Sequence, residues 1–163
     1  MTVWITSDTH FGHTNIIRYC SRPFKDADEM NRALVSNWNS VVQPNDTIWH
    51  LGDVTFGNVK VLKELNGTIN LCLGNHDREN FLRKTGRFAF MTNEIFILDL
   101  LNYPALVLFH YPMEDWPAKY PGAIHFHGHS HGRAPKVKNR LDVGVDCFCF
   151  KPITLEEAVA AAH

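Results

Sequence analysis

The sequence lacks a surplus of positive charge: its 16 lysine and arginine residues are balanced by 17 aspartate and glutamate residues, giving a formal net charge of −1. Binding to nucleic acid without sequence preference depends on basic side chains that neutralise phosphates. The charge balance therefore argues against a general nucleic-acid-binding protein, although it leaves room for a local basic patch.

Long apolar runs and paired cysteines are also missing. No stretch approaches the roughly 18 apolar residues that predict a membrane span, and the start, MTVWITSDTH, has neither the positive nor the apolar region of a signal peptide. The four cysteines form no C-x-x-C pair, which argues against a zinc ribbon or a disulfide framework. We expect reduced thiols that mostly serve packing, in a cytoplasmic protein without a membrane partner.

The chain has 163 residues, 45% of them hydrophobic and 20% charged, which is typical of a globular protein, and we expect a single domain over residues 1–163. Short apolar runs predict strands at Val3–Ser7, Thr47–Leu51, Ile69–Leu73, Glu94–Leu100, Ala105–Phe109, Ala123–Phe126 and Leu141–Phe148. Apolar spacing and capping residues predict helices at Asp26–Val42, at Asn58–Leu65, just after Asp77, and from Thr154 to Ala162. Strands alternate with helices in the first half and dominate the second. This order predicts an α/β (α+β) fold with sheets covered by helices.

Polar side chains that bind metals follow five of the predicted strands. In chain order they are Asp8, His10, Asp53, Asn75, His110, His129 and His131. Ligands of α/β sheets bind beyond the carboxyl ends of the strands, so one site could collect them all. Taken singly, an aspartate or asparagine after a strand is more typical of a turn or a cap, and a histidine there is often only hydrogen-bonded. Their joint order favours a site.

Seven oxygen and nitrogen donors are more than one metal ion needs. They suit two divalent ions that share a bridging carboxylate, and the imidazoles favour manganese, iron, zinc or nickel over magnesium. Two such ions about 3.5–4 Å apart form a clamp for displacement at phosphorus and supply hydroxide from a bridging water. The pattern thus predicts a dinuclear phosphoesterase, with manganese as the favoured metal.

The motifs DTH at 8–10, GD at 52–53, GNHD at 74–77, His110 and GHSH at 128–131 occur in this order along most of the chain. In this respect the sequence resembles the calcineurin-like metallophosphoesterases. It is most similar to short bacterial and phage-type members, which begin with a stretch like SDTHFGHTNIIRYCSRPF and end with one like NRLDVGVDCFCFKPITLEE. These are predicted phosphoesterases without a settled substrate.

The resemblance implies two stacked mixed β-sheets flanked by helices, and it implies roles for individual residues. One metal would be held by Asp8, His10 and His131, the other by Asn75, His110 and His129, and Asp53 would bridge the two. His76 would face the substrate, where it stabilises the phosphoryl charge or protonates the leaving oxygen. Asp77 would orient His76.

One departure from the family concerns the substrate. Many protein phosphatases of the superfamily carry an arginine shortly after the GD aspartate, whereas Asp53 is followed by Val-Thr-Phe-Gly. The missing guanidinium puts phosphoprotein substrates in doubt. We expect a small phosphorylated substrate, with phosphodiesters, including nucleotides, favoured over phosphomonoesters. The alternatives are a catalytically degenerate binding or scaffold protein and a metal-dependent nuclease. The sequence does not determine the oligomeric state.

Other polar residues allow two interpretations each. Histidines 125 and 127 are more typical of supporting or structural roles than of ligation, and His13 either touches the substrate or caps a helix. Four basic residues at 133–140 form either a solvated loop or a rim that attracts phosphate. In the loop at 111–120, Trp116 and Tyr120 either stack on a nucleobase or pack on the surface.

Overall fold

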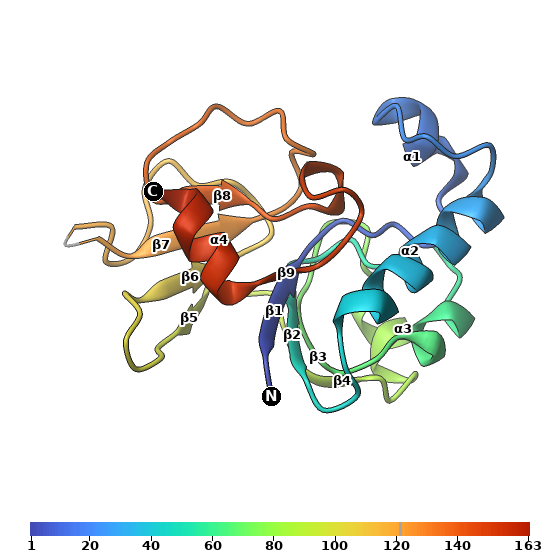
Figure 1. The fold of residues 1–163 in the computed structure, drawn as a ribbon, viewed down its shortest axis with the longest axis horizontal. Helices are drawn as coiled ribbons and strands as arrows, with labels where there is room; N and C mark the ends of the chain where they lie inside the picture. The colour runs from blue at the N-terminus through green and yellow to red at the C-terminus, as the bar shows by residue number, and fades with distance from the viewer. Residues whose placement is uncertain (121) are drawn as a thin grey trace.

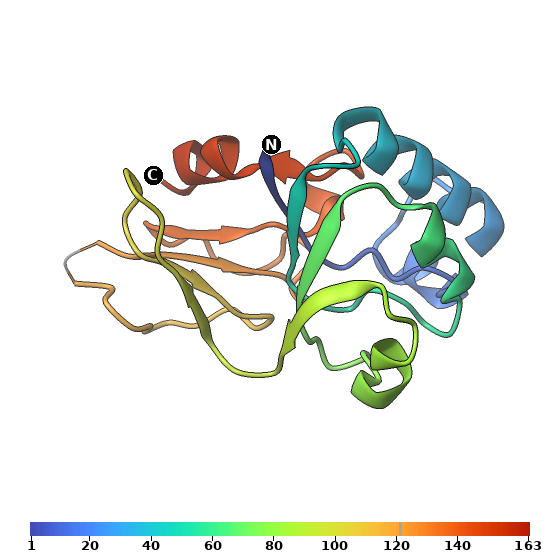
Figure 2. The same ribbon diagram turned by 90° about the horizontal axis from the view of Figure 1, so that it is seen from below.

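The computed structural model of the protein describes residues 1–120 and 122–163 and contains two β-sheets (Figures 1 and 2). The first sheet has the order β4-β3-β2-β1-β9, and the second has the order β5-β6-β7-β8. The strands of the first sheet are β1 (Val3–Thr6), β2 (Thr47–His50), β3 (Thr68–Cys72), β4 (Phe88–Thr92) and β9 (Ile153–Thr154). Those of the second are β5 (Phe96–Leu98), β6 (Leu106–Leu108), β7 (Ile124–His127) and β8 (Arg140–Asp142).

Both sheets are mixed, with a parallel centre and one antiparallel edge. Strands β1 to β4 run parallel and β9 pairs antiparallel with β1. Likewise β6, β7 and β8 run parallel and β5 is antiparallel to β6. A parallel bridge between Ser7 and Gly144 links the chain just after β1 to the chain just after β8. The carboxyl ends of the parallel strands of both sheets therefore meet at one edge.

The two sheets pack face to face through alternate residues of their strands. Ile5 of β1 and Trp49 of β2 share one buried cluster with Leu106 of β6 and Phe126 of β7. The neighbouring residues point the other way, as Ile48 does toward the helices and Val107 toward the loop that carries Trp116. The expected two-residue alternation thus gives each sheet an inner and an outer buried face.

Helices cover the outer face of the first sheet, and one helix closes its edge. These are α1 (Thr14–Tyr19), α2 (Ala27–Val41), the 3₁₀ turn η1 (Lys60–Glu64), α3 (Glu79–Arg83) and α4 (Leu155–Ala162). Figure 1 shows α1 and α2 on the right of β1 to β4, with β5 to β8 on the left and α4 beside β8 and β9. The expected fold class, two mixed sheets flanked by helices, is confirmed.

The periodic apolar residues of α2 behave as the sequence predicts. Met30, Leu34 and Trp38 are at most 2% exposed and pack against the first sheet. The Asp26 side chain accepts a hydrogen bond from the Glu29 amide at 2.7 Å and caps the helix. At the other end of the chain, Thr154 and Glu157 form the expected capping box of α4.

Several elements differ from the prediction. The predicted strand Leu141–Phe148 is a strand only as far as Asp142, and the 3₁₀ turn η2 (Val145–Cys147) follows, because the chain leaves β8 to pair with Ser7. Asn58–Leu65 forms the 3₁₀ turn η1 instead of an α-helix. The sequence analysis did not identify α1, which is too short for a clear period, or β4, an edge strand with exposed residues. No helix in the described part of the chain is long and apolar enough to cross a membrane.

The N-cap of α2 can be tested by substitution. Asp26→Ala removes the acceptor for the Glu29 amide, so we expect the free energy of unfolding to fall by about 1 kcal/mol and the melting temperature by about 2–4 °C. Asp28→Ala is the matched control, because it removes a carboxylate from the same first turn without removing a cap. Equal losses in urea unfolding of the two variants would contradict a capping role for Asp26.

Candidate metal centre

The loops that follow the strands bring all seven predicted ligands together. His10 Nε2 lies 3.8 Å from Asp8 Oδ1 and 3.5 Å from Asp53 Oδ2. On the other side of Asp53, the same Oδ2 lies 3.6 Å from His110 Nε2. Two groups of potential ligand atoms, each within 4.8 Å, come from these loops: Asp8, His10 and His131 form one, and Asp53, His110 and His129 form the other. A third such group, Cys20, His131 and Asp146, shares His131 with the first.

Asn75 extends the second group. Its Oδ1 lies 3.0 Å from His110 Nε2 and 3.0 Å from His129 Nδ1. Asp53 has contacts on both sides, to His10 in one group and to His110 in the other. This is the position that a bridging carboxylate would require.

Backbone conformation at the site is unusual. Asp8, His10, Asp53, His129 and His131 all have positive φ angles, of 58°, 51°, 55°, 66° and 47°. Residues with a Cβ rarely adopt this left-handed conformation, and such strain tends to persist where function requires it. The tight turns at the strand ends hold these side chains close to one another.

Two glycines let the loops approach one another. A Cβ at Gly74 would lie 2.2 Å from Asp53 Oδ1, and a Cβ at Gly128 would lie 2.3 Å from Asp8 Oδ2. Any larger residue would collide with a predicted ligand. These contacts explain the glycines of the GNHD and GHSH motifs.

Two buried polar atoms at the site have no hydrogen-bond partner among the described residues, namely Asp8 Oδ1 and His10 Nε2. Burial raises the pKa of the Asp8 carboxyl to about 8 and lowers the pKa of His10. Although Asp8 Oδ2 accepts the His129 amide at 2.9 Å, a buried carboxylate oxygen and a buried imidazole nitrogen without partners are costly inside a protein unless something satisfies them. A divalent cation does so, since carboxylate oxygen and imidazole nitrogen are its usual ligands. The residues therefore fit a metal ion.

His110 is fixed in the orientation that suits ligation. Its Nδ1 donates to the Leu51 carbonyl at 2.7 Å. The proton on Nδ1 leaves the Nε2 lone pair directed toward Asp53 and Asn75. A backbone carbonyl that orients a histidine in this way is common around protein-bound metals.

Asp146 orients His131 in a similar way, and the sequence analysis did not identify it. His131 Nδ1 donates to Asp146 Oδ2 at 2.7 Å. Arg22 binds the same carboxylate through two hydrogen bonds, at 2.8 and 2.7 Å, and also donates to the Asp8 carbonyl at 2.7 Å. Burial alone would lower the pKa of His131, but the hydrogen bond to Asp146 raises it to about 10. No signal in the sequence marked it, because Asp146 lies inside the predicted strand Leu141–Phe148, whereas the structure places it in η2.

Asp77 has different partners from those predicted. Its carboxylate accepts hydrogen bonds from the amides of Asp53, Val54 and Gly74, at 2.8, 2.9 and 2.9 Å. Burial raises the pKa of Asp77 to about 6, although these hydrogen bonds oppose the rise. Instead of orienting the His76 ring, Asp77 ties the loop after β2 to the loop after β3.

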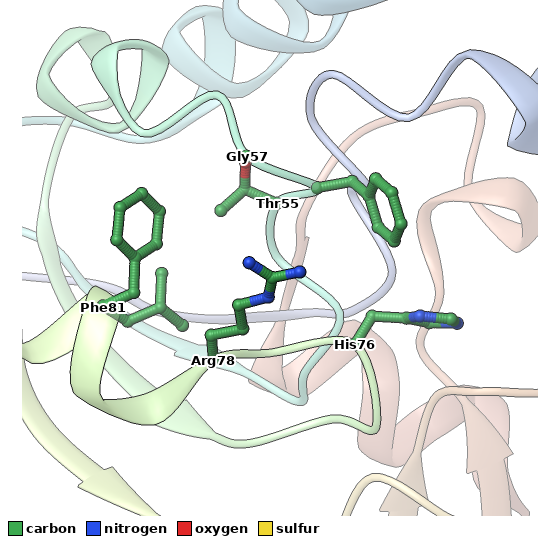
Figure 3. A pocket seen from close by; sticks show the side chains of 7 residues that line it. Thr55, Gly57, His76, Arg78 and Phe81 are labelled. Atoms are coloured by element: carbon green, nitrogen blue, oxygen red, sulfur yellow. The ribbon is translucent and has the colours of Figure 1, made fainter.

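His76 is exposed and lies at the rim of the site. Its amide donates to Asp53 Oδ1 at 2.9 Å, and its ring centroid is 5.6 Å from that of His10. The His76 side chain also lines a pocket with Arg78 and Phe81 (Figure 3). It can therefore meet a substrate that approaches the two groups.

Three other histidines have structural roles. His50, His125 and His127 are at most 2% exposed and hydrogen-bonded to neighbouring groups. For example, His125 Nδ1 donates to the Val107 carbonyl at 3.0 Å. Both His125 and His127 belong to β7 and bond to the backbone, which fits the supporting or structural roles expected for them.

The basic segment at 133–140 and the aromatic loop at 111–120 are partly structural. Arg140 is buried and donates to the carbonyls of Met113 and Pro135, and Arg133 donates to the Tyr19 carbonyl. Trp116 is buried as well and does not offer an exposed stacking surface. Arg133, Lys136 and Lys138 are the exposed charges of that segment, and of these Arg133 is hydrogen-bonded to the backbone.

Comparison with known proteins extends these observations. The profile of the calcineurin-like phosphoesterase superfamily domain matches residues 1–145. An uncharacterized protein of Methanocaldococcus jannaschii is 34% identical over 94% of this chain and 87% of its own, and the gene 66 protein of Mycobacterium phage L5 is 26% identical over 89% and 86%.

A solved structure has the same fold. A protein of unknown function from Aquifex aeolicus superposes with a TM-score of 0.77 at 27% identity, covering 96% of each chain. The family profile spans the DTH, GD, GNHD, His110 and GHSH motifs. The resemblance inferred from these motifs is confirmed, and the chain belongs to the calcineurin-like phosphoesterase superfamily, whose members are metal-dependent hydrolases of phosphoric esters.

Proposed function

We propose that the protein is a dinuclear metal-dependent phosphoesterase that hydrolyses a small phosphodiester. The observation that carries this proposal is the position of Asp53 between two groups of ligands, with Asp8 Oδ1 and His10 Nε2 buried beside it without a partner. A structural polar cluster would satisfy these atoms internally. Their geometry instead suits two cations that share one carboxylate.

The residues divide into two ligand sets and a third group around them. Asp8, His10 and His131 would hold one ion, Asn75, His110 and His129 the other, and Asp53 both. When bound, the two ions polarise the phosphoryl oxygens and lower the pKa of the attacking water. His76 is exposed beside the ligands, where its ring protonates the leaving oxygen. Asp77 and Asp146 hold the loops and His131 in place.

The substrate is proposed to be small, and nucleotide-type diesters are favoured. The loop after Asp53 carries Thr55, Phe56 and Gly57 at the rim, in place of a phosphate-binding arginine. Manganese is the favoured metal, with iron, zinc and nickel as alternatives. A scaffold protein without activity is disfavoured, because every ligand position is filled.

Metal removal and Asp53→Asn should both abolish turnover. We expect two manganese ions per chain in the wild type, and a loss of bis(p-nitrophenyl) phosphate hydrolysis of about 100-fold or more in Asp53→Asn, because a neutral amide cannot bridge two cations and the clamp contributes several kcal/mol. Metal content is measured by mass spectrometry. Asp99→Asn, on the exposed surface, is the control. Full activity of chelator-treated protein would contradict the proposal.

His76→Ala should slow turnover without removing metal. General acids typically contribute 10²–10⁴-fold, and we expect a loss in that range for a ribose leaving group. The loss should be smaller for p-nitrophenolate, which leaves without a proton. His163→Ala, at the exposed terminus, serves as the control. Equal losses for both leaving groups would refute His76 as the proton donor.

Asp146→Asn should lower the affinity for the metal ion that His131 would help to hold. Partners of ligating histidines typically contribute 10–100-fold to metal affinity, so manganese titration should show that loss for one of the two ions. Asp115→Asn, whose side chain is 85% exposed, should leave both affinities unchanged. An unchanged titration of Asp146→Asn would show that the Asp146 contact does not support ligation.

A further inference from the structure

A pocket of about 220 Å³ opens next to His76 (Figure 3). One wall comes from the loop after β2, with Thr55 and Phe56, and the other from α3, with Arg78 at its N-cap and Phe81 and Leu82 within it. The volume is below the roughly 300–1,000 Å³ of a whole small-molecule site. It is enough for a single ring system, with the rest of the ligand outside.

The walls of the pocket expose aromatic rings to solvent. Phe56 is 52% exposed and Phe81 is 42% exposed, whereas Leu82, which also lines the pocket, is buried. The Phe56 ring is held in place, because it stacks on His13 with centroids 4.4 Å apart and planes at 15°. Two exposed phenylalanines around one pocket form an apolar surface that a planar ring can cover.

Arg78 supplies the only cationic side chain that lines this pocket in the described part of the chain. Figure 3 shows its guanidinium reaching into the space between Phe81 and His76. The nearby carboxylate of Glu79 is bound to Arg83, at 2.6 Å, and does not neutralise Arg78. The hydrogen bonds and ion pairs found among the described residues include none from the Arg78 side chain. Its donors are thus available to a ligand.

We propose that this pocket binds the nucleobase of a nucleotide whose phosphate lies at the metal centre. This inference rests on the proposed phosphoesterase activity and names its substrate class. A base stacks on aromatic side chains, and its ring nitrogens and carbonyl oxygens accept hydrogen bonds from a guanidinium. A plain hydrocarbon ring would cover the phenylalanines but leave the Arg78 donors without acceptors.

The position of His76 determines which part of the substrate enters. His76 lines the pocket and also lies beside the metal ligands, with its amide bonded to Asp53. A nucleoside attached to the leaving oxygen would extend from His76 into the pocket. The base therefore belongs to the leaving group.

Calorimetry on the manganese-loaded full chain tests the assignment with phosphomonoesters and inorganic phosphate, which contain no diester bond. The probes are AMP, GMP, ribose 5-phosphate and inorganic phosphate, which share a phosphate and differ in the base. We expect at least one nucleotide to bind about tenfold more tightly than ribose 5-phosphate, the size typical of one stacked base.

Two variants locate the base. Phe81→Ala and Arg78→Gln should each reduce the advantage of the nucleotide over ribose 5-phosphate by several-fold or more. Their controls are Phe90→Ala, which removes a similarly exposed ring outside the pocket, and Arg32→Gln, which removes an exposed guanidinium of α2 outside the pocket and leaves the Glu79–Arg83 pair intact. Both control variants should bind the nucleotide more tightly than ribose 5-phosphate by the same factor as the wild type.

The outcomes separate this inference from the proposed function. If inorganic phosphate and ribose 5-phosphate bind but neither nucleotide binds more tightly, the pocket assignment is wrong and the phosphoesterase proposal stands. If Phe81→Ala and Arg78→Gln both still prefer the nucleotide over ribose 5-phosphate as strongly as the wild type, the assignment is also wrong, because the base then binds elsewhere. If no phosphate compound binds to the metal-loaded protein, both proposals fail.

Discussion

The buried carboxylate of Asp53 is the interaction on which the rest of the site depends. It lies between His10 and His110, it accepts the amide of His76, and Gly74 leaves room for it. Its own backbone is held by Asp77, which also holds Gly74. A carboxylate in this environment must be compensated by positive charge, since burial without a partner is costly. Gly74, the left-handed backbone of Asp53 and the histidines on either side of its carboxylate all accommodate it there.

Part of this arrangement could be predicted from sequence because it is local. Short apolar runs located seven of the strands, although the run over β8 extended beyond it, and the residue types after the strands marked the candidate ligands. The contact between the two sheets could not be predicted from short stretches of sequence. It depends on the pairing of Ser7 with Gly144, residues more than a hundred positions apart. The same pairing interrupts the predicted strand after Asp142 and brings Asp146 under His131.

Polar residues whose partners are distant were harder to interpret. Asp77 follows His76 directly, so the sequence suggested contact between these neighbours, whereas the fold turns its carboxylate toward three amides. Arg22 precedes a proline in an ordinary-looking loop, yet it joins Asp146 to the Asp8 carbonyl. Arg140 looked like part of a charged rim and is buried against carbonyl groups. In each case the decisive fact is what the side chain reaches in three dimensions.

Each of the two ligand groups draws residues from both sheets. Asp8 and His10 follow a strand of the first sheet and His131 a strand of the second, while Asn75 comes from the first and His110 from the second. In the proposed metal-loaded form, each cation is thus a cross-link between two layers that otherwise adhere through non-directional apolar packing. In that form, metal binding at this end of the two sheets is coupled to the stability of their packing against each other.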